Sequence, residues 1–227
     1  MTKFLALILF ALALSPFMPV QAGGDEKAPV QEKAIEYKNW KFKSLTDGKE
    51  IELRKAIKDK KLVMIVYFAP WCGNWRNEWP IVSKMYEKYK ADGFDVIGVG
   101  EYGTKDEIKN FFGEKGAPFT VVIESETRDD RDKTSHYQYR QTTGDTRNWG
   151  SPYNIFLEPN KLNKKGDTLT EKAWIVQGEL IEDNIEPFIR EHLGLPAMMD
   201  QKTSLNLDKK VEACDPNSSN NLKLKKP

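Results

Sequence analysis

The stretch around Cys72 constrains the fold of this chain more than any other part of the sequence. Leu62–Phe68 is an unbroken apolar run rich in β-branched residues, which indicates a strand buried on both faces. Apolar residues then recur at helical spacing over residues 81–89 and predict a helix. Cys72 therefore lies at a strand-to-helix turn, where the helix dipole and unpaired backbone N–H groups favour thiolate over thiol.

The residues around Cys72 also resemble a known active-site segment. A motif W-C-x-x-C-x-x-E-x-P after a hydrophobic strand is typical of thioredoxin-like proteins, in particular the TlpA/ResA-type thiol–disulfide oxidoreductases, or redoxins. The residues that match this motif are Trp71, Cys72, Gly73, Glu78 and Pro80. Trp75 stands where the motif has its second cysteine, so the dithiol has become a monothiol. The resemblance implies an α/β, thioredoxin-like fold with a central mixed β-sheet flanked by helices and an N-terminal β-hairpin extension.

We expect four parts along the chain. Residues 1–22 contain a lone Lys3, an apolar run and a small-residue Val-Gln-Ala end, which predicts a cleaved secretory signal peptide. An uncleaved N-terminal anchor is the alternative. Residues 23–36 are small and charged and are interpreted as a disordered lead, 37–194 as the thioredoxin-like domain, and 195–227 as a flexible C-terminal tail. The protein is therefore expected to be periplasmic or secreted.

Other patterns predict the elements of the domain. Apolar and polar residues alternate on both sides of a turn at 46–49, which suggests a β-hairpin. Pro80 should kink the helix that begins at Cys72. Residues 94–100 form a second buried strand and complete a βαβ unit with a right-handed crossover. The remaining expected elements are a short helix at 53–58, a helix at 104–112, a short strand or extended run at 118–123, a hairpin from 153 to 178 and a helix at 181–193.

The segment 124–148 breaks this pattern because it begins with almost no apolar residues. It predicts an exposed loop that leads into a short polar helix around 136–141. We interpret the segment either as a solvated insertion or as a flap that faces a substrate or partner.

Pro152 is the second feature with chemical content. It enters an apolar strand after Gly150 and Ser151, and a proline there must lie at the first residue of the strand or on an edge. The resemblance implies a cis-proline at this step, facing Cys72, with the preceding backbone pairing with an extended substrate. We therefore predict that the Ser151–Pro152 bond is cis. An ordinary trans proline at a strand start is the alternative.

Composition excludes several classes of partner and site. A formal net charge of +1 offers no footprint for nucleic acid or an anionic membrane surface. Two cysteines, Cys72 and Cys214, exclude a disulfide-dense scaffold. The two histidines, His136 and His192, have no metal-ligand spacing, and each is interpreted as a surface or half-buried residue. We expect no metal and no cofactor.

A lone Cys72 changes the mechanism that the resemblance implies. In a dithiol enzyme the second cysteine resolves the mixed disulfide, and Trp75 cannot do so. Release then needs an outside thiol, the substrate's own second thiol, or Cys214, since a flexible tail of that length spans on the order of 25 Å. Thioredoxins carry a buried acid at the position of Val66, so that proton acceptor is absent. Glu78 is the candidate acid–base group, although a solvent-facing helix carboxylate is the simpler interpretation.

Two functional hypotheses follow. The first is an exported monothiol thiol–disulfide oxidoreductase, reductase-like or isomerase-like, that acts on exported proteins with thiols or disulfides and has a redox partner protein. Its catalytic residues are Cys72 and Glu78, and Cys214 is the candidate resolving thiol. Its substrate-binding residues are Trp71, Trp75, Ser151, Pro152 and Tyr153. The second is a redox-inactive module that holds an extended peptide or a partner in a groove lined by Trp71, Trp75, Trp79 and Tyr153. A peroxidase is disfavoured because the Thr-x-x-Cys pattern is absent.

Overall fold

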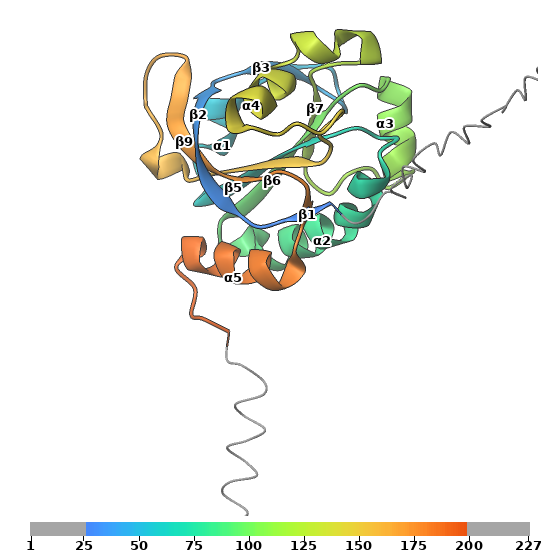
Figure 1. Cartoon of the computed structure of the whole chain (residues 1–227). Coiled ribbons are helices and arrows are strands. Elements are labelled where there is room, and N and C mark those ends of the chain that lie inside the picture. The colour runs from blue at the N-terminus through green and yellow to red at the C-terminus, as the bar shows by residue number, and fades with distance from the viewer. Residues whose placement is uncertain (1–25, 199–227) are drawn as a thin grey trace, which may run out of the picture.

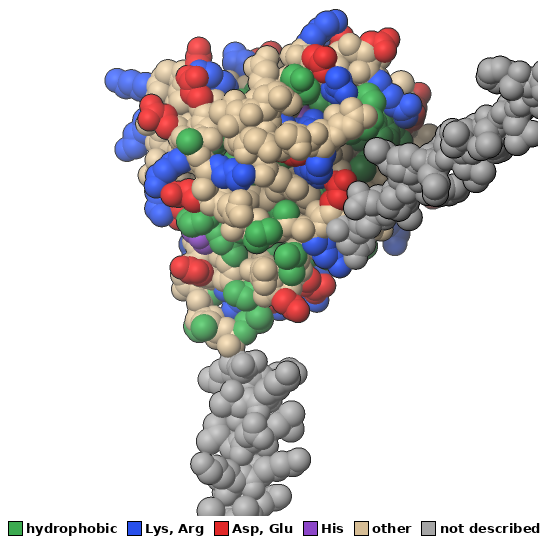
Figure 2. Space-filling view, in the orientation of Figure 1, with side chains coloured by type: hydrophobic (Ala, Val, Ile, Leu, Met, Phe, Trp, Pro, Cys, Tyr) green, Lys and Arg blue, Asp and Glu red, His purple; other side chains and the backbone are tan. Residues whose placement is uncertain are grey.

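The computed structural model describes residues 26–198 (Figure 1). The predicted signal peptide, Cys214 and most of the predicted tail lie outside the described residues. Within residues 26–198, no helix has the length and apolar character needed to cross a membrane. Figure 2 shows acidic and basic side chains interspersed over one face of the molecule.

A mixed sheet forms the centre of the molecule. Its strand order is β2-β9-β8-β5-β6-β7-β3-β4. The strands are β2 (Gln31–Lys38), β3 (Lys41–Ser44), β4 (Glu50–Glu52), β5 (Leu62–Phe68), β6 (Phe94–Gly100), β7 (Thr120–Ile123), β8 (Tyr153–Leu157) and β9 (Thr168–Val176). The central strand β5 runs parallel to β6 and antiparallel to β8. A small second sheet pairs β1 (Lys27–Ala28) with β10 (Glu179–Leu180).

Helices cover both faces of the sheet (Figure 1). They are α1 (Leu53–Ile57), α2 (Gly73–Tyr89), α3 (Lys105–Phe112), α4 (Ser135–Thr143) and α5 (Glu182–Leu193), with 3-10 turns η1 (Lys90–Asp92), η2 (Arg128–Lys133) and η3 (Pro159–Lys161). Side chains of α2, α3 and α5 pack with Met64 and Val66 of β5, whereas α1 and α4 pack with Ile65 and Tyr67. Successive residues of β5 thus face opposite cores, as the pleat of a strand requires.

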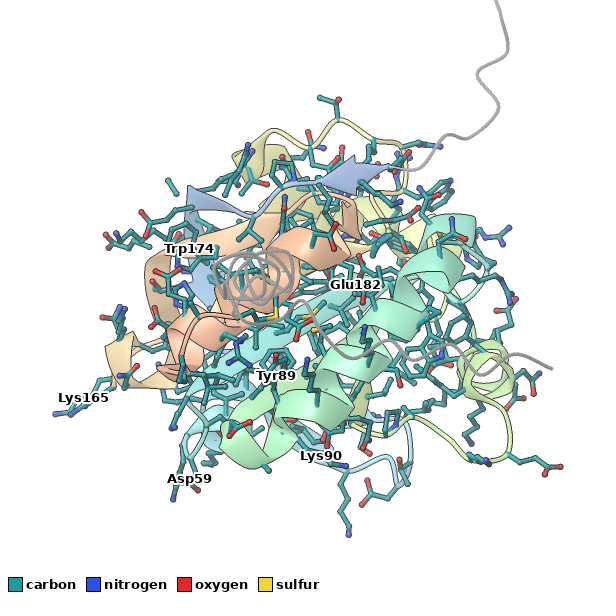
Figure 3. All side chains as sticks on the ribbon, turned by 90° about the horizontal axis from the view of Figure 1, so that it is seen from below. Asp59, Tyr89, Lys90, Lys165, Trp174 and Glu182 are labelled. Atoms are coloured by element: carbon teal, nitrogen blue, oxygen red, sulfur yellow. The ribbon has the colours of Figure 1, made fainter. Side chains whose placement is uncertain are left out.

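The predicted fold class is confirmed. Every residue of β5 is buried, the hairpin of β3 and β4 forms, and α2 follows β5 with Pro80 inside it. Figure 3 shows α2 and α5 from below, with Tyr89 on the first and Glu182 at the start of the second. The predicted helix at 104–112 forms as α3, and Thr104 and Glu107 make a capping box at its start.

The interpretation of 23–36 as a disordered lead is wrong for the residues that the structure describes. β2 pairs with β9 along most of its length, and Ile35 is buried. Exposed Glu32 and Glu36 flank the inward positions. The strand lies at the edge of the sheet, where charged outward side chains are common, so its composition resembled that of a solvated lead. The domain therefore begins before Tyr37.

The interpretation of 124–148 as solvated is wrong for its helix. α4 buries His136, Tyr139, Arg140 and Thr143, which occur at the i, i+3, i+4 and i+7 positions of one helical face. His136 and Arg140 are 0% exposed, so His136 is neither a surface nor a half-buried residue. The inward face is polar because other parts of the chain supply its hydrogen-bond partners, and a scan for apolar residues does not reveal it.

Candidate active site

Cys72 lies where β5 gives way to α2. It is the N-cap residue of α2, is half-buried, and is a free cysteine. Its Sγ lies 3.1 Å from the carbonyl oxygen of Ser151 and donates a hydrogen bond to it. The thiol therefore sits at the positive end of the helix dipole and directly against the loop that leads into β8.

The Ser151–Pro152 peptide bond is cis and precedes β8. The hydroxyl of Ser151 accepts a hydrogen bond from the backbone N–H of Ala69 at 2.9 Å. Ser151 is thus held by the β5–α2 loop through both its side chain and its carbonyl oxygen. These two hydrogen bonds connect the β5–α2 loop to the loop before β8, beside the Cys72 thiol.

Trp75, at the position of the missing cysteine, does not line a groove. Its side chain is 0% exposed and stacks on Phe68, with ring centroids 4.7 Å apart, and on Phe111 at 5.6 Å. Its indole Nε1 has no hydrogen-bond partner in the described part of the chain. The first turn of α2 presents this position to the core on one face of the sheet, so the prediction that Trp75 binds substrate is wrong in this structure.

Tyr153 is also withdrawn from the surface. It is 0% exposed, packs in the core on the opposite face of the sheet from Trp75, and its hydroxyl lies 2.9 Å from Thr143 Oγ1 of α4. The strand pleat points it away from the thiol side. The predicted groove of Trp71, Trp75, Trp79 and Tyr153 does not form, because the side chains of Trp75 and Tyr153 are buried.

Glu78 is buried, and the simpler interpretation of a solvent-facing carboxylate is wrong. Its Oε2 accepts hydrogen bonds from the backbone N–H of Leu180 at 2.7 Å and from Asn154 Nδ2 at 3.1 Å. Burial, together with the negative charge of Glu179, raises the pKa of Glu78 to about 8, although both hydrogen bonds oppose the shift. α2 thus supplies a buried, proton-bearing acid in a fold that has Val66 where thioredoxins carry theirs.

Trp71 is the predicted binding residue that remains accessible. It is half-buried, its indole Nε1 donates to the carbonyl oxygen of Tyr102 at 2.9 Å, and Arg128 lies 4.5 Å from its ring centroid. Trp149 meets it edge to face at 5.2 Å. A pocket of about 280 Å³ lies beside it. The pocket is lined by Pro70, Trp71, Arg76, Glu107, Asn110 and Phe111.

Sequence reasoning missed several residues of this site. His136 Nδ1 lies 2.9 Å from the Tyr102 hydroxyl, and its Nε2 lies 3.2 Å from the carbonyl oxygen of Gly150. Burial and the positive charge of Arg140 lower the pKa of His136 to about 3, so the ring is neutral. The helical spacing of His136 and Arg140 was a signal for an inward face, whereas nothing local marks Tyr102 as the partner of His136.

Asp145 and Glu101 are two further buried carboxyl residues. Asp145 Oδ2 contacts Arg140 Nε at 3.2 Å and Arg147 Nη2 at 2.7 Å, and against the effect of burial these cations lower the pKa of Asp145. Glu101 follows β6 and is fully buried. Burial and the neighbouring Glu124 carboxyl raise the pKa of Glu101 well above its ordinary value. Within residues 26–198, no group of three or more His, Cys, Asp or Glu side chains is placed to hold a metal ion.

Relatives with known names share parts of this chain. The ResA thiol–disulfide oxidoreductase of Bacillus anthracis is 35% identical over 78 residues, which is 34% of this chain and 44% of that protein. ResA of Oceanobacillus iheyensis is 26% identical over 131 residues, or 58% of this chain and 57% of the relative. The matches thus span about half the length of these relatives.

Two further comparisons concern the fold and the family. A secreted thiol–disulfide isomerase from Corynebacterium glutamicum has a similar fold, with a TM-score of 0.50 and 15% identity over 72% of this chain and 92% of that one. The Redoxin family model matches residues 26–157, from the start of the described structure to the end of β8. The chain therefore belongs to the redoxin family and is a TlpA/ResA-type thioredoxin-like protein.

Proposed function

We propose that this protein performs thiol–disulfide exchange on exported proteins, with Cys72 as its nucleophile. The observation that carries the proposal is the half-buried Cys72 thiol at the N-terminus of α2, with its Sγ 3.1 Å from the Ser151 carbonyl beside a cis-proline. A thiol so placed is half-buried at the N-terminus of a helix and contacts the loop against which we propose that an extended substrate docks.

The exchange balances with one protein thiol. The Cys72 thiolate attacks one sulfur of a substrate disulfide, so that a Cys72–substrate disulfide forms, the substrate disulfide breaks, and the released substrate thiolate takes up a proton. Attack by the substrate's own thiol on the mixed disulfide then frees Cys72 and leaves a re-paired substrate, which is isomerisation. Attack by an outside thiol on the Cys72 sulfur instead releases the reduced substrate and leaves Cys72 bonded to that thiol, and a second outside thiol then frees Cys72 as the two outside thiols leave joined in a disulfide. Cys214 remains a candidate resolving thiol outside the described residues.

Glu78 is proposed as the acid–base group of the site. Its raised pKa of about 8 keeps the carboxyl protonated near neutral pH, which is what donation to a departing thiolate requires. Its hydrogen bonds to Asn154 and Leu180 hold it between α2 and the strands β8 and β10.

Trp71 and the Ser151–Pro152 backbone are proposed to bind substrate. Trp71 offers an accessible ring beside Cys72, and the pocket next to it can take one substrate side chain. Trp75 and Tyr153 support the site from within, since both are buried.

The protein is proposed to be periplasmic or secreted after cleavage of residues 1–22. The secreted isomerase of similar fold and the apolar N-terminal segment support this location. Its partners would then be exported proteins with thiols or disulfides and a redox partner protein that renews the thiol.

The test is the thiol state of Cys72 in the protein as it accumulates in its own compartment. Acid quenching, alkylation and mass spectrometry should detect mixed disulfides through Cys72, or a Cys72–Cys214 bridge. A Cys214→Ser variant tests whether Cys214 is the resolving thiol. If it is, mixed disulfides between Cys72 and substrates should accumulate in the variant. A Cys72 that is uniformly free and alkylates no faster than an unstructured peptide thiol contradicts the proposal.

The second candidate function is a redox-inactive binding module. It is favoured by Trp75, whose packed ring occupies the place of the resolving cysteine. In that case Cys72→Ala would keep every partner that the wild-type protein captures. Loss of partners on Cys72→Ala, which removes little volume, would count against it.

A further inference from the structure

The loop that faces Cys72 is held from behind by a buried histidine. Cys72 and Ser151 are 79 positions apart in the chain, so their contact depends on tertiary structure. Beyond the Ala69–Ser151 hydrogen bond, a buried polar connection to this loop passes through His136 of α4, whose two ring nitrogens both have partners.

The partners of His136 determine where its proton lies. The carbonyl oxygen of Gly150 can only accept, so Nε2 must carry the hydrogen and donate to it at 3.2 Å. Nδ1 of the neutral ring is then an acceptor, and the Tyr102 hydroxyl must donate to it at 2.9 Å. Both bonds are buried and both have one defined direction.

Tyr102 connects this histidine to the other side of the thiol. Its hydroxyl donates to His136, while its carbonyl oxygen accepts from the indole of Trp71, the residue before Cys72. Tyr102 has φ 57° and is the only non-glycine residue with positive φ in the described part of the chain. An aromatic residue rarely adopts this conformation, so the surrounding contacts must hold it there.

Gly150 is fixed on its second side by Arg140. A Cβ at Gly150 would lie 1.8 Å from Arg140 Nε, and the backbone has φ +56°, so only glycine fits. Arg147 donates to the carbonyl oxygen of Pro152 at 3.0 Å from the same segment. The backbone from Gly150 to Pro152 is therefore confined by groups that the 124–150 segment supplies.

We propose that His136 is a positioning residue of this site: by joining Tyr102 to Gly150, it holds the Ser151–Pro152 backbone at the distance from Cys72 at which an extended substrate docks. The inference rests on the proposed function for the docking step alone. The positional effect on the loop is independent of whether the protein exchanges disulfides.

Three variants of the full-length protein test it. His136→Leu keeps a buried side chain but removes both bonds, His136→Gln keeps an amide donor for the Gly150 carbonyl, and Tyr102→Phe removes the hydroxyl while the Trp71 bond to its carbonyl stays. Each variant is assayed with an unstructured peptide that carries one activated 2-thiopyridyl disulfide, and separately with iodoacetamide, a small reagent that does not need the loop.

His136→Leu should slow exchange with the peptide about tenfold, the scale expected when a docking surface shifts by a fraction of an ångström. Its alkylation rate should stay within about twofold, because α2 and its dipole are unchanged. His136→Gln should recover most of the exchange rate, and Tyr102→Phe should lie between the two. Amide hydrogen exchange over residues 144–153 should quicken in the same order.

The outcomes separate the inference from the proposed function. If His136→Leu leaves both the peptide rate and the hydrogen exchange of 144–153 at wild-type values, the inference is overturned, and an equal loss in both thiol reactions also overturns it. If the wild-type protein does not react with the peptide, the proposed function fails, and hydrogen exchange alone decides the role of His136. Should His136→Leu not fold, Tyr102→Phe supplies the same comparison.

Discussion

The first turn of α2 and the segment from Glu124 to Gly150 approach the same thiol with opposite chemistry. The α2 side is apolar: Trp75 stacks between Phe68 and Phe111, and its indole N–H has no hydrogen-bond partner among residues 26–198. The side formed by the segment from Glu124 to Gly150 is polar, because Arg140 and Asp145 are buried there as an ion pair. One side should therefore depend on filled volume, and the other on matched charge.

The largest change in the free energy of unfolding should come from removing the Trp75 side chain on the apolar α2 side. Trp75→Ala removes the largest fully buried side chain of the described residues and should destabilise the protein by about 4 kcal/mol. Urea unfolding measures it, with Trp149→Ala as the control, since that half-buried ring should cost less. Trp75→Cys restores the family spacing and should suffer a similar loss, so a stable Trp75→Cys protein would contradict the packing argument.

The polar side should be destabilised when the buried charge of Arg140 loses its countercharge. Asp145→Ala leaves Arg140 buried with no countercharge and should cost about 3 kcal/mol. Asp132→Ala is the matched control on the same segment, because Asp132 is exposed and should cost less than about 0.5 kcal/mol. If the two substitutions have equal effects on urea unfolding, the segment is solvated as its composition first suggested.

The smallest of the three effects is a dependence of the free energy of unfolding on pH, caused by Glu78 of α2. The folded-state pKa of Glu78, about 8, lies above its ordinary value of 4.5, so the folded chain binds more protons than the unfolded chain between these pH values. Stability is therefore lost as pH rises through this window. Between pH 5 and pH 7 the contribution should be about 2 kcal/mol.

Glu78→Gln should flatten that slope. Its amide oxygen can accept the hydrogen bonds from Asn154 and Leu180, and it cannot ionise. The measurement is the free energy of unfolding at a series of pH values for both proteins. Parallel curves for wild type and variant would show that Glu78 does not bear the shifted pKa.

Local pattern predicted the elements that surround the thiol but placed some side chains on the wrong side of them. β5, α2 and the hairpin of β3 and β4 follow directly from apolar periodicity, since strand and helix repeats are properties of neighbouring residues. Trp75 and Glu78 also follow the inward period of α2. The resemblance drew attention to their chemistry, and the face they occupy was overlooked.

His136 shows where sequence reasoning stops. A polar side chain is buried only if a distant segment supplies its partners, and here those partners are Tyr102 and Gly150 on two other loops. The sequence predicted a short polar helix here, but only the tertiary structure revealed that one face of α4 is buried and what that face touches.

The sequence by itself determined the βαβ core, the place of Cys72 at a helix N-terminus, and the absence of a second motif cysteine, because each depends on residues close together in the chain. Only the tertiary structure decided that Glu78 is a buried acid and that Trp75 is core. The backbone N–H that satisfies Glu78 comes from Leu180, 102 positions away. Burial of a polar group requires such long-range partners, and no local pattern specifies them.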